Sequence, residues 1–192
     1  MIQNLKEQGS YIKQNFPGVK VEPIKGDNLI IYSKSSEIID LLTFLKNDKD
    51  LSFKTLVDLF ATDMLGKREP RFEVVYVLLS YKLNNRITIK VSLKDEEKIP
   101  SAVKVYPSAN WLEREVFDMY GVSFNDHPDL RRILSDYGFE GYPLRKDFPL
   151  TGYKQVKYDE DKKEVVYEPV DLTQEFRQFD FESPWEGDKT KR

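Results

Sequence analysis

Residues 71–93 show the clearest pattern of apolar and polar positions in the chain. After Glu73 the segment up to residue 80 is apolar at nearly every position, which is typical of a central strand that is buried on both faces. In residues 87–93 apolar and polar side chains alternate, as in a strand with one solvated face. The polar residues 82–85 between the two runs can form a turn, so this pattern predicts a hairpin.

The N-terminal part of the chain predicts two helices and a second hairpin. Residues 2–16 place apolar side chains at helical spacing and are followed by a Pro-Gly pair, which ends the helix. Two β-rich runs within 19–32 are joined by turn-forming residues and predict a hairpin. A helix with one broad apolar face follows, and Ser35 or Ser36 can cap its N-terminus. The run 51–63 suits a buried strand or a buried helix, of which the strand is favoured.

A helix is also predicted at residues 109–120, between a capping serine, Ser108, and Gly121. Its apolar residues form a stripe and leave little of the helix surface for water. Its charges are therefore candidates for partly buried ion pairs with charged residues of the following segment. The expected members of this charge-paired junction are Glu113, Arg114, Glu115, Asp118, Arg131, Arg132, Arg145 and Lys146.

From residue 100 onward the chain combines many aromatic residues with seven of the ten prolines. Prolines interrupt long helices, whereas a solvated linker lacks so many rings. We therefore expect an α+β domain at residues 1–146, with helices packed on a mixed sheet in two layers. Residues 147–192 are expected to form an extended, aromatic- and proline-rich arm that docks on another subunit.

The composition excludes several kinds of chemistry. Among 192 residues there is one histidine and no cysteine, so a disulfide, a cysteine-held iron–sulfur cluster and a multi-histidine zinc site are excluded. A net charge of -3 argues against a nucleic-acid partner. The longest wholly apolar stretch, residues 74–79, is far shorter than the roughly 20 residues that span a bilayer. The first eight residues have the character of neither a signal nor a transit peptide, so we expect neither membrane span nor export.

Two interpretations of the acidic residues differ in kind. Glu115, Asp118 and His127 can be interpreted as a metal site, or the two carboxylates as an acid–base pair. The single histidine argues against the bundle type of metal site, which repeats a Glu-x-x-His turn. Pairing of the carboxylates with arginines is therefore favoured, and His127 is expected to be a hydrogen-bonded turn residue before Pro128. No glycine-rich nucleotide-binding motif and no nucleophile elbow occurs.

Three stretches of the chain resemble the signature of a known family. They read Asn-Trp-Leu-Glu-Arg-Glu-Val-Phe-Asp-Met-Tyr-Gly at 110–121, His-Pro-Asp-Leu-Arg-Arg-Ile-Leu at 127–134, and Asp-Tyr-Gly-Phe-Glu-Gly-Tyr-Pro-Leu-Arg-Lys-Asp-Phe-Pro at 136–149. Shorter matches continue to residue 185. In these stretches the chain resembles the 30 kDa subunit family of respiratory complex I, which in bacteria is the C subunit of NADH-quinone oxidoreductase. Tyr142 stands where the family often has histidine, which puts an obligatory proton-transfer role at that position in doubt.

The resemblance implies a peripheral-arm subunit of the proton-translocating NADH:quinone oxidoreductase. Such a subunit holds no cofactor, because FMN, the iron–sulfur clusters, quinone and NADH belong to other subunits of the complex. Its expected partners are other peripheral-arm subunits, chiefly the large subunit that lines the quinone site. Its expected location is the cytoplasmic face of the bacterial inner membrane, or the matrix side in an organelle.

The residues expected to make interface or structural contacts, rather than catalytic ones, are Trp111, Glu113, Arg114, Glu115, Asp118, His127, Arg131, Arg132, Arg145, Lys146, Asp147 and Trp185. Two alternatives to the NADH:quinone oxidoreductase remain open. One is the equivalent subunit of a membrane-bound hydrogenase-type complex. The other is a stand-alone carboxylate-metal hydrolase.

Overall fold

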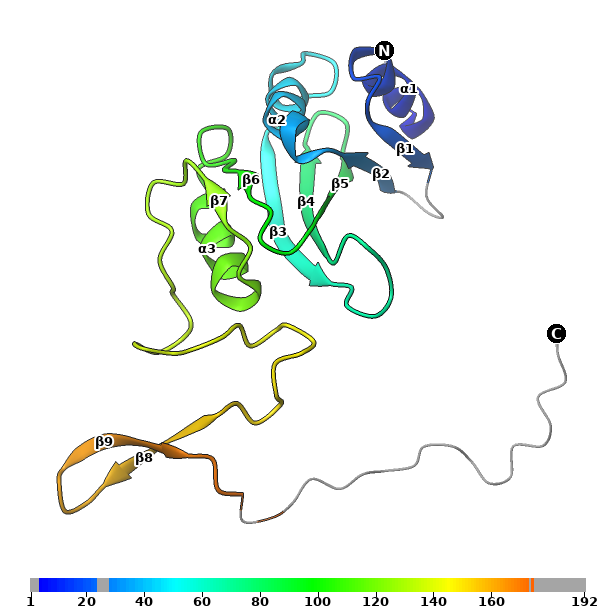
Figure 1. Cartoon of the computed structure of the whole chain (residues 1–192). Helices are drawn as coiled ribbons and strands as arrows, with labels where there is room; N and C mark the ends of the chain where they lie inside the picture. The colour runs from blue at the N-terminus through cyan, green and yellow to red at the C-terminus, as the bar shows by residue number, and fades with distance from the viewer. Residues whose placement is uncertain (1–3, 24–27, 173, 175–192) are drawn as a thin grey trace, which may run out of the picture. The chain divides into compact units, whose positions relative to one another are not determined.

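A computed structural model describes residues 4–23, 28–172 and 174, and the contacts divide the chain into two units that meet between Leu150 and Thr151. The elements of the first unit are α1 (Leu5–Asn15), β1 (Lys20–Pro23), β2 (Asn28–Ser33), the short 3-10 helix η1 (Ser35–Glu37), α2 (Ile38–Asn47), β3 (Thr55–Asp63), β4 (Phe72–Ser80), β5 (Asn85–Leu93), β6 (Ile99–Pro100), α3 (Ala109–Tyr120) and β7 (Phe124–Asn125) (Figure 1). The second unit contains β8 (Lys154–Asp159) and β9 (Glu164–Pro169).

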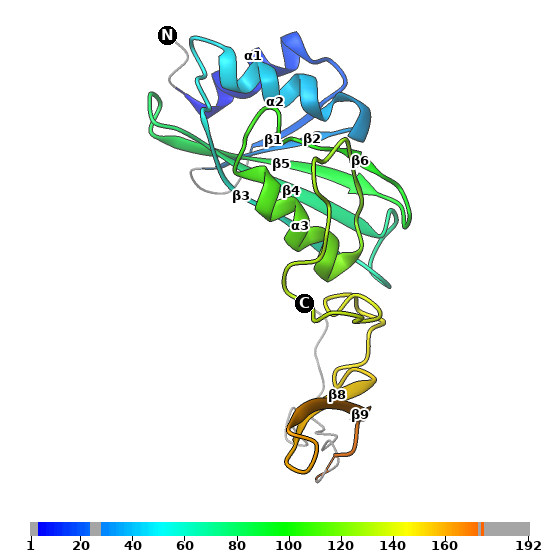
Figure 2. The ribbon, with the colours of Figure 1, turned by 90° about the vertical axis from the view of Figure 1, so that its left-hand side faces the viewer.

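A five-stranded mixed sheet forms the centre of the first unit. Its strand order is β1-β2-β5-β4-β3, with β2 and β5 parallel and all other neighbours antiparallel. The register places Leu59, Tyr76 and Ile89 side by side on three adjacent strands. All three are buried in one hydrophobic core, to which α1, α2 and α3 also contribute. Figure 2 shows α3 lying across the sheet. The expected α+β fold with helices on a mixed sheet is confirmed.

Most elements predicted from the hydrophobic pattern are present. The hairpins within 19–32 and 71–93 are β1–β2 and β4–β5, and the ambiguous run 51–63 contains the strand β3. Gly121 ends α3 with a φ of 76°, in the left-handed region that glycine adopts without strain. A Cβ atom there would lie 2.5 Å from the ring of Tyr142, so the tight approach of this side chain also requires glycine.

The predicted serine caps are wrong. Ser108 adopts helical angles, φ -62° and ψ -23°, and its side chain makes no capping hydrogen bond. Ser35 belongs to η1, and its hydroxyl donates to a carboxylate oxygen of Glu97 at 3.1 Å, so it cannot cap α2. In both places a turn continues directly into the helix, whereas a side-chain cap requires extended backbone at the capping residue.

The second unit contains a β-hairpin. Its strands β8 and β9 are antiparallel, and their register runs from Lys154 opposite Pro169 to Asp159 opposite Glu164. Residues 154–169 of the expected arm therefore have regular structure. Residue 173 and residues 175–192 lie outside the described residues, and the candidate Trp185 is among them. None of the helices in the described part of the chain has the length and apolar character needed to cross a membrane.

Candidate functional site

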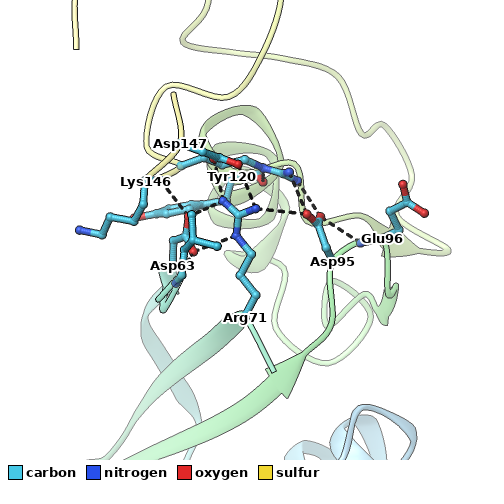
Figure 3. A network of polar contacts seen from close by, with 9 residues as sticks. Asp63, Arg71, Asp95, Glu96, Tyr120, Lys146 and Asp147 are labelled. Carbon is cyan, nitrogen blue, oxygen red and sulfur yellow. Dashed lines mark hydrogen bonds and ion pairs between the residues drawn. The ribbon is translucent and has the colours of Figure 1, made fainter. Parts of the chain in front are cut away.

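One polar junction of the first unit is centred on Arg71, which directly precedes β4 (Figure 3). Its guanidinium binds Asp63 at the end of β3 in bidentate fashion, with Nε to Oδ1 at 3.0 Å and Nη2 to Oδ2 at 2.7 Å. The same group donates to Asp147 Oδ1 at 2.7 Å and to Asp95 Oδ2 at 3.3 Å. One arginine thus joins the ends of β3 and β4 to the loop after β5 and to the last loop of the unit.

Residues 145–147 are bound to this junction by further contacts. Arg145 donates to both oxygens of Asp95, at 3.1 and 3.2 Å, and its Nε donates to the carbonyl oxygen of Tyr120 at 2.6 Å. The backbone N–H of Lys146 donates to Asp63 Oδ2 at 2.8 Å. These bonds attach the loop to the sheet and to the end of α3.

The electrostatics of this junction favour charged carboxylates. Burial raises the pKa of Asp63, but the hydrogen bonds from Arg71 and from the N–H groups of Lys146 and Leu65 outweigh it and lower the pKa to about 2. Hydrogen bonds from Arg71, the largest cause, also lower the pKa of Asp147. The site is therefore a structural ion-pair network, in which the carboxylates of Asp63 and Asp147 are held ionised.

A second polar junction surrounds Glu113, which is fully buried on α3. Its carboxylate accepts hydrogen bonds from Ser101 Oγ at 2.6 Å and from the N–H of Ala102 at 2.7 Å, and it has no arginine partner among the described residues. Burial raises its pKa to about 7 against the opposing effect of these two donors. The pKa of Tyr76 on β4 is raised mainly by burial. The nearby charge of Glu113 raises the pKa of Tyr76 further.

His127 is adjacent to Glu113, with 3.8 Å between Nε2 and Oε2. Its Nδ1 accepts from the N–H of Asp129 at 3.0 Å, so Nε2 carries the proton and donates to the carbonyl oxygen of Asn110 at 3.1 Å. Both ring nitrogens of His127 are thereby used in holding the turn after β7 against α3.

A third junction is formed by Asp118, which is fully buried near the C-terminal end of α3. Its Oδ2 accepts from the N–H groups of residues 133, 134 and 135 at 2.6–2.9 Å. Its Oδ1 accepts from Ser135 Oγ at 2.6 Å and from Arg132 Nη1 at 3.2 Å. Burial acts to raise the pKa of Asp118, but the bonds from Ser135 and from the backbone lower it to about 2. One carboxylate therefore fixes the loop 132–135 on α3.

The other predicted site residues have different surroundings. Arg114 is buried, with its guanidinium 4.7 Å from the ring of the exposed Trp111, and donates to the carbonyl oxygen of Arg131 at 3.3 Å. Glu115 is exposed, as are the side chains of Arg131 and Asp129, which pair with each other at 3.0 Å.

The eight residues expected to pair around α3 are therefore divided among separate junctions. The direct ion pair within that set is the one between Asp118 and Arg132. The sequence pattern did not identify Arg71, Asp63 and Asp95 as site residues. Their signal in the sequence is the presence of charged residues at the ends of the apolar strand segments, and this signal does not specify which charges pair.

No group of three or more His, Asp and Glu side chains able to hold a metal ion occurs among the described residues. Asp118 is used in bonds to Arg132 and the loop, while Glu115 faces solvent, so the two carboxylates of the suggested acid–base pair do not share a pocket. The contacts of these side chains hold loops against the sheet and against α3.

The family model and the curated relatives that match this chain name the same kind of protein. Residues 31–154 match the family model of the respiratory-chain NADH dehydrogenase 30 Kd subunit. The C subunit of NADH-quinone oxidoreductase from Chelativorans sp. is 54% identical over 188 residues, which is 97% of this chain and 94% of the relative. That from Paramagnetospirillum magneticum is 55% identical over 189 residues, with the same coverage of both chains.

Two solved structures are similar as well. A trypsin-resistant fragment of Nqo5 has a TM-score of 0.54 and 28% identity, and the match covers 66% of this chain and 98% of the fragment. A chain in the structure of the membrane-bound sulfane sulfur reductase, an archaeal respiratory membrane complex, has a TM-score of 0.67 and 26% identity. That match covers 84% of this chain and 98% of the archaeal chain.

Proposed function

The chain belongs to the respiratory-chain NADH dehydrogenase 30 kDa subunit family, and from this we propose that it is a structural subunit of NADH-quinone oxidoreductase. The observation that carries the proposal is the match of 97% of the chain to the C subunit of that enzyme at more than 50% identity. The geometry supports a structural role, because the buried charges at the three junctions bind loops of their own chain.

The chain itself holds no redox cofactor in this proposal. Its sequence contains no cysteine, so it offers no thiolate for an iron–sulfur cluster. NADH oxidation, electron transfer through FMN and the clusters, and quinone reduction then belong to other subunits. The contribution of this chain is to hold its neighbours in place while electrons pass.

The principal partner in this proposal is the large subunit that lines the quinone site. The docking segment is the arm expected at residues 147–192, and the complex is expected to hold this chain on the cytoplasmic face of the membrane. The bonds of Arg71 to Asp147 and of Asp63 to the N–H of Lys146 give that segment a fixed starting point on the first unit.

Purification of the tagged chain from its native membrane tests the proposal. We expect NADH:quinone reductase activity, FMN and iron–sulfur clusters to co-purify with the chain, and we expect deletion of the chain to abolish that activity. Activity that persists at the normal level without the chain would contradict the proposal.

The similarity to a chain of the archaeal sulfane sulfur reductase favours, as second candidate, a related membrane complex with another reaction. A nickel–iron centre in the co-purified large subunit, as in a hydrogenase-type complex, would select that candidate.

A further inference from the structure

Glu113 connects α3 to the segment 101–103, which follows β6. Its Oε2 accepts from Ser101 Oγ at 2.6 Å, and its Oε1 accepts from the N–H of Ala102 at 2.7 Å. The N–H of Val103 donates in turn to Ser101 Oγ at 3.3 Å. One buried carboxyl group therefore holds three successive residues against the helix.

Few backbone hydrogen bonds attach this segment to the rest of the first unit. β6 and β7 form a two-stranded sheet of their own, apart from the five-stranded sheet. The N–H of Ile99 donates to the carbonyl oxygen of Ser123 at 3.1 Å. The N–H of Ser101 donates to the carbonyl oxygen of Asn125 at 2.9 Å. Residues 102 and 103 lie beyond the end of this short ladder, so the segment can open locally while the larger sheet stays folded.

Glu113 has no lysine or arginine partner within the part of the chain that the structure describes. Arg114, the next residue on α3, places its guanidinium 4.7 Å from the Trp111 ring and donates to the carbonyl oxygen of Arg131. Lys104, on the segment after β6, is exposed to solvent. A buried carboxylate without a cation is energetically costly, so burial favours the neutral acid.

Two titratable groups face Glu113 from other elements, and neither supplies a positive charge. The hydroxyl of Tyr76 on β4 is buried and has no hydrogen-bond partner among the described residues. The ring of His127, in the turn after β7, has its Nε2 3.8 Å from Oε2 of Glu113. Its Nδ1 accepts from the N–H of Asp129, so a second proton on the ring would break that bond.

We propose that Glu113 is a proton-dependent latch, which as a neutral acid holds the segment 101–103 closed on α3 and on losing its proton to solvent releases that segment. A neutral carboxyl group can donate from Oε2 to Ser101 Oγ over the same 2.6 Å, while Oε1 still accepts from Ala102. An ionised carboxylate is stabilised by water, which it reaches only when the segment opens. The latch is a property of this chain's own fold and does not depend on the proposed function.

The latch works in a defined range of pH. Burial raises the pKa of Glu113 to about 7 in the closed state, whereas a carboxyl group in the open segment has the ordinary pKa of 4.5. Between these two values the closed state binds the proton and the open state releases it, so opening becomes more frequent as the pH rises. Above about pH 7 both states are ionised, and opening no longer depends on pH.

Amide hydrogen exchange of the full-length chain tests the latch. The protection factor of the Ala102 amide compares its measured rate with the intrinsic rate at the same pH. We expect it to fall about tenfold per pH unit between about pH 5 and pH 6.5. Glu113→Gln keeps the shape of the neutral acid but cannot ionise, so its protection factor should not depend on pH. Glu115→Gln is the matched control, since Glu115 is exposed on the same helix, and should retain the wild-type dependence.

The amide of Ile89 on β5 separates local opening from unfolding of the whole unit. This strand is paired on both sides in the five-stranded sheet. We expect Ile89 to be about tenfold or more better protected than Ala102 throughout the pH range. Equal protection of the two amides would overturn the latch, because the segment would then open only together with the sheet. A pH dependence of Ala102 that persists in Glu113→Gln would overturn it as well.

Nuclear magnetic resonance of the wild-type chain gives a second measurement that needs no variant. The carboxyl carbon of Glu113 should titrate with a midpoint near pH 7, and the ring nitrogens of His127 should show a neutral ring at about pH 6. A Glu113 midpoint at or below 4.5 would overturn the inference. A protonated His127 beside an ionised Glu113 would also overturn it, because an ion pair would then hold the two elements together.

Discussion

Glu113 and Asp118 are both fully buried on α3, but their surroundings act on their carboxyl groups in opposite directions. Asp118 is surrounded by donors and stays ionised, with a pKa of about 2. Glu113 has two donors and no cation bound to it among the described residues, and burial raises its pKa to about 7. The two residues therefore affect stability in different ranges of pH.

Glu113 is expected to reduce stability as the pH rises from about 4.5 to about 7. Because its pKa is raised in the folded state, the folded chain binds more protons than the unfolded chain in that window, and the free energy of unfolding falls with pH. A shift of this size corresponds to roughly 3 kcal/mol. Urea unfolding across this window should show the slope in the wild type and a smaller slope in Glu113→Gln. An unchanged slope in the variant would contradict this assignment.

Asp118→Ala is expected to lower the free energy of unfolding by roughly 3–5 kcal/mol, because it leaves Arg132 and three backbone N–H groups without their acceptor. Glu115→Ala is the matched control, since Glu115 has the same charge, lies on the same helix and is exposed. The control should stay within about 0.5 kcal/mol of the wild type. Denaturant unfolding at pH 7 measures both, and equal losses would refute the role of Asp118.

At the scale of elements, Arg71 joins segments that are far apart in the sequence. Its partners Asp63, Asp95 and Asp147 are 8, 24 and 76 residues away. Removal of one exposed partner should loosen the last loop without leaving a buried charge, since Arg71 keeps its bidentate pair with Asp63.

Asp147→Ala is therefore expected to increase amide hydrogen exchange of residues 145–148 by about tenfold, while the free energy of unfolding changes by less than about 1 kcal/mol. Asp129→Ala removes an exposed ion pair with Arg131 elsewhere and should leave exchange of these residues unchanged. Exchange measured by mass spectrometry would count against the junction if both variants behaved alike.

The hydrophobic pattern was sufficient to predict β4, β5 and α3. A buried helix or strand places its apolar residues at a characteristic spacing, and this spacing can be recognised within its own sequence. The partners of buried charges could not be predicted in this way. Asp118 is bound mainly by backbone N–H groups, which every residue except proline carries, and Glu113 by Ser101 and Ala102 rather than by an arginine. Ser108 resembles a cap in sequence, but the preceding turn already sets its backbone angles as helical.

At the scale of the whole molecule, the contacts separate residues up to Leu150 from those that follow. The aromatic and proline pattern predicts an arm that starts at residue 147, whereas Asp147 and the N–H of Lys146 are bonded to Arg71 and Asp63 in the first unit. A truncation that is meant to remove only the arm should therefore keep these residues.

A chain that ends at Leu150 is expected to unfold at the same temperature as the full chain, within a few degrees, because the core lies within the first unit. It should nevertheless fail to enter the complex, since it lacks the arm. Thermal unfolding and co-purification with NADH:quinone reductase activity measure the two properties separately. Normal incorporation of the shortened chain would refute the docking role of the arm.

The parallel pairing of β2 with β5 also determines when the sheet can be completed during synthesis. Ser33 of β2 lies opposite Val91 of β5, and α2, β3 and β4 are made between them. The antiparallel strands β3, β4 and β5 follow one another closely and can pair early, whereas β2 must wait for a distant partner. Until residue 93 has left the ribosome, the N-terminal hairpin therefore exposes an unpaired strand edge, which is prone to aggregation in a nascent chain.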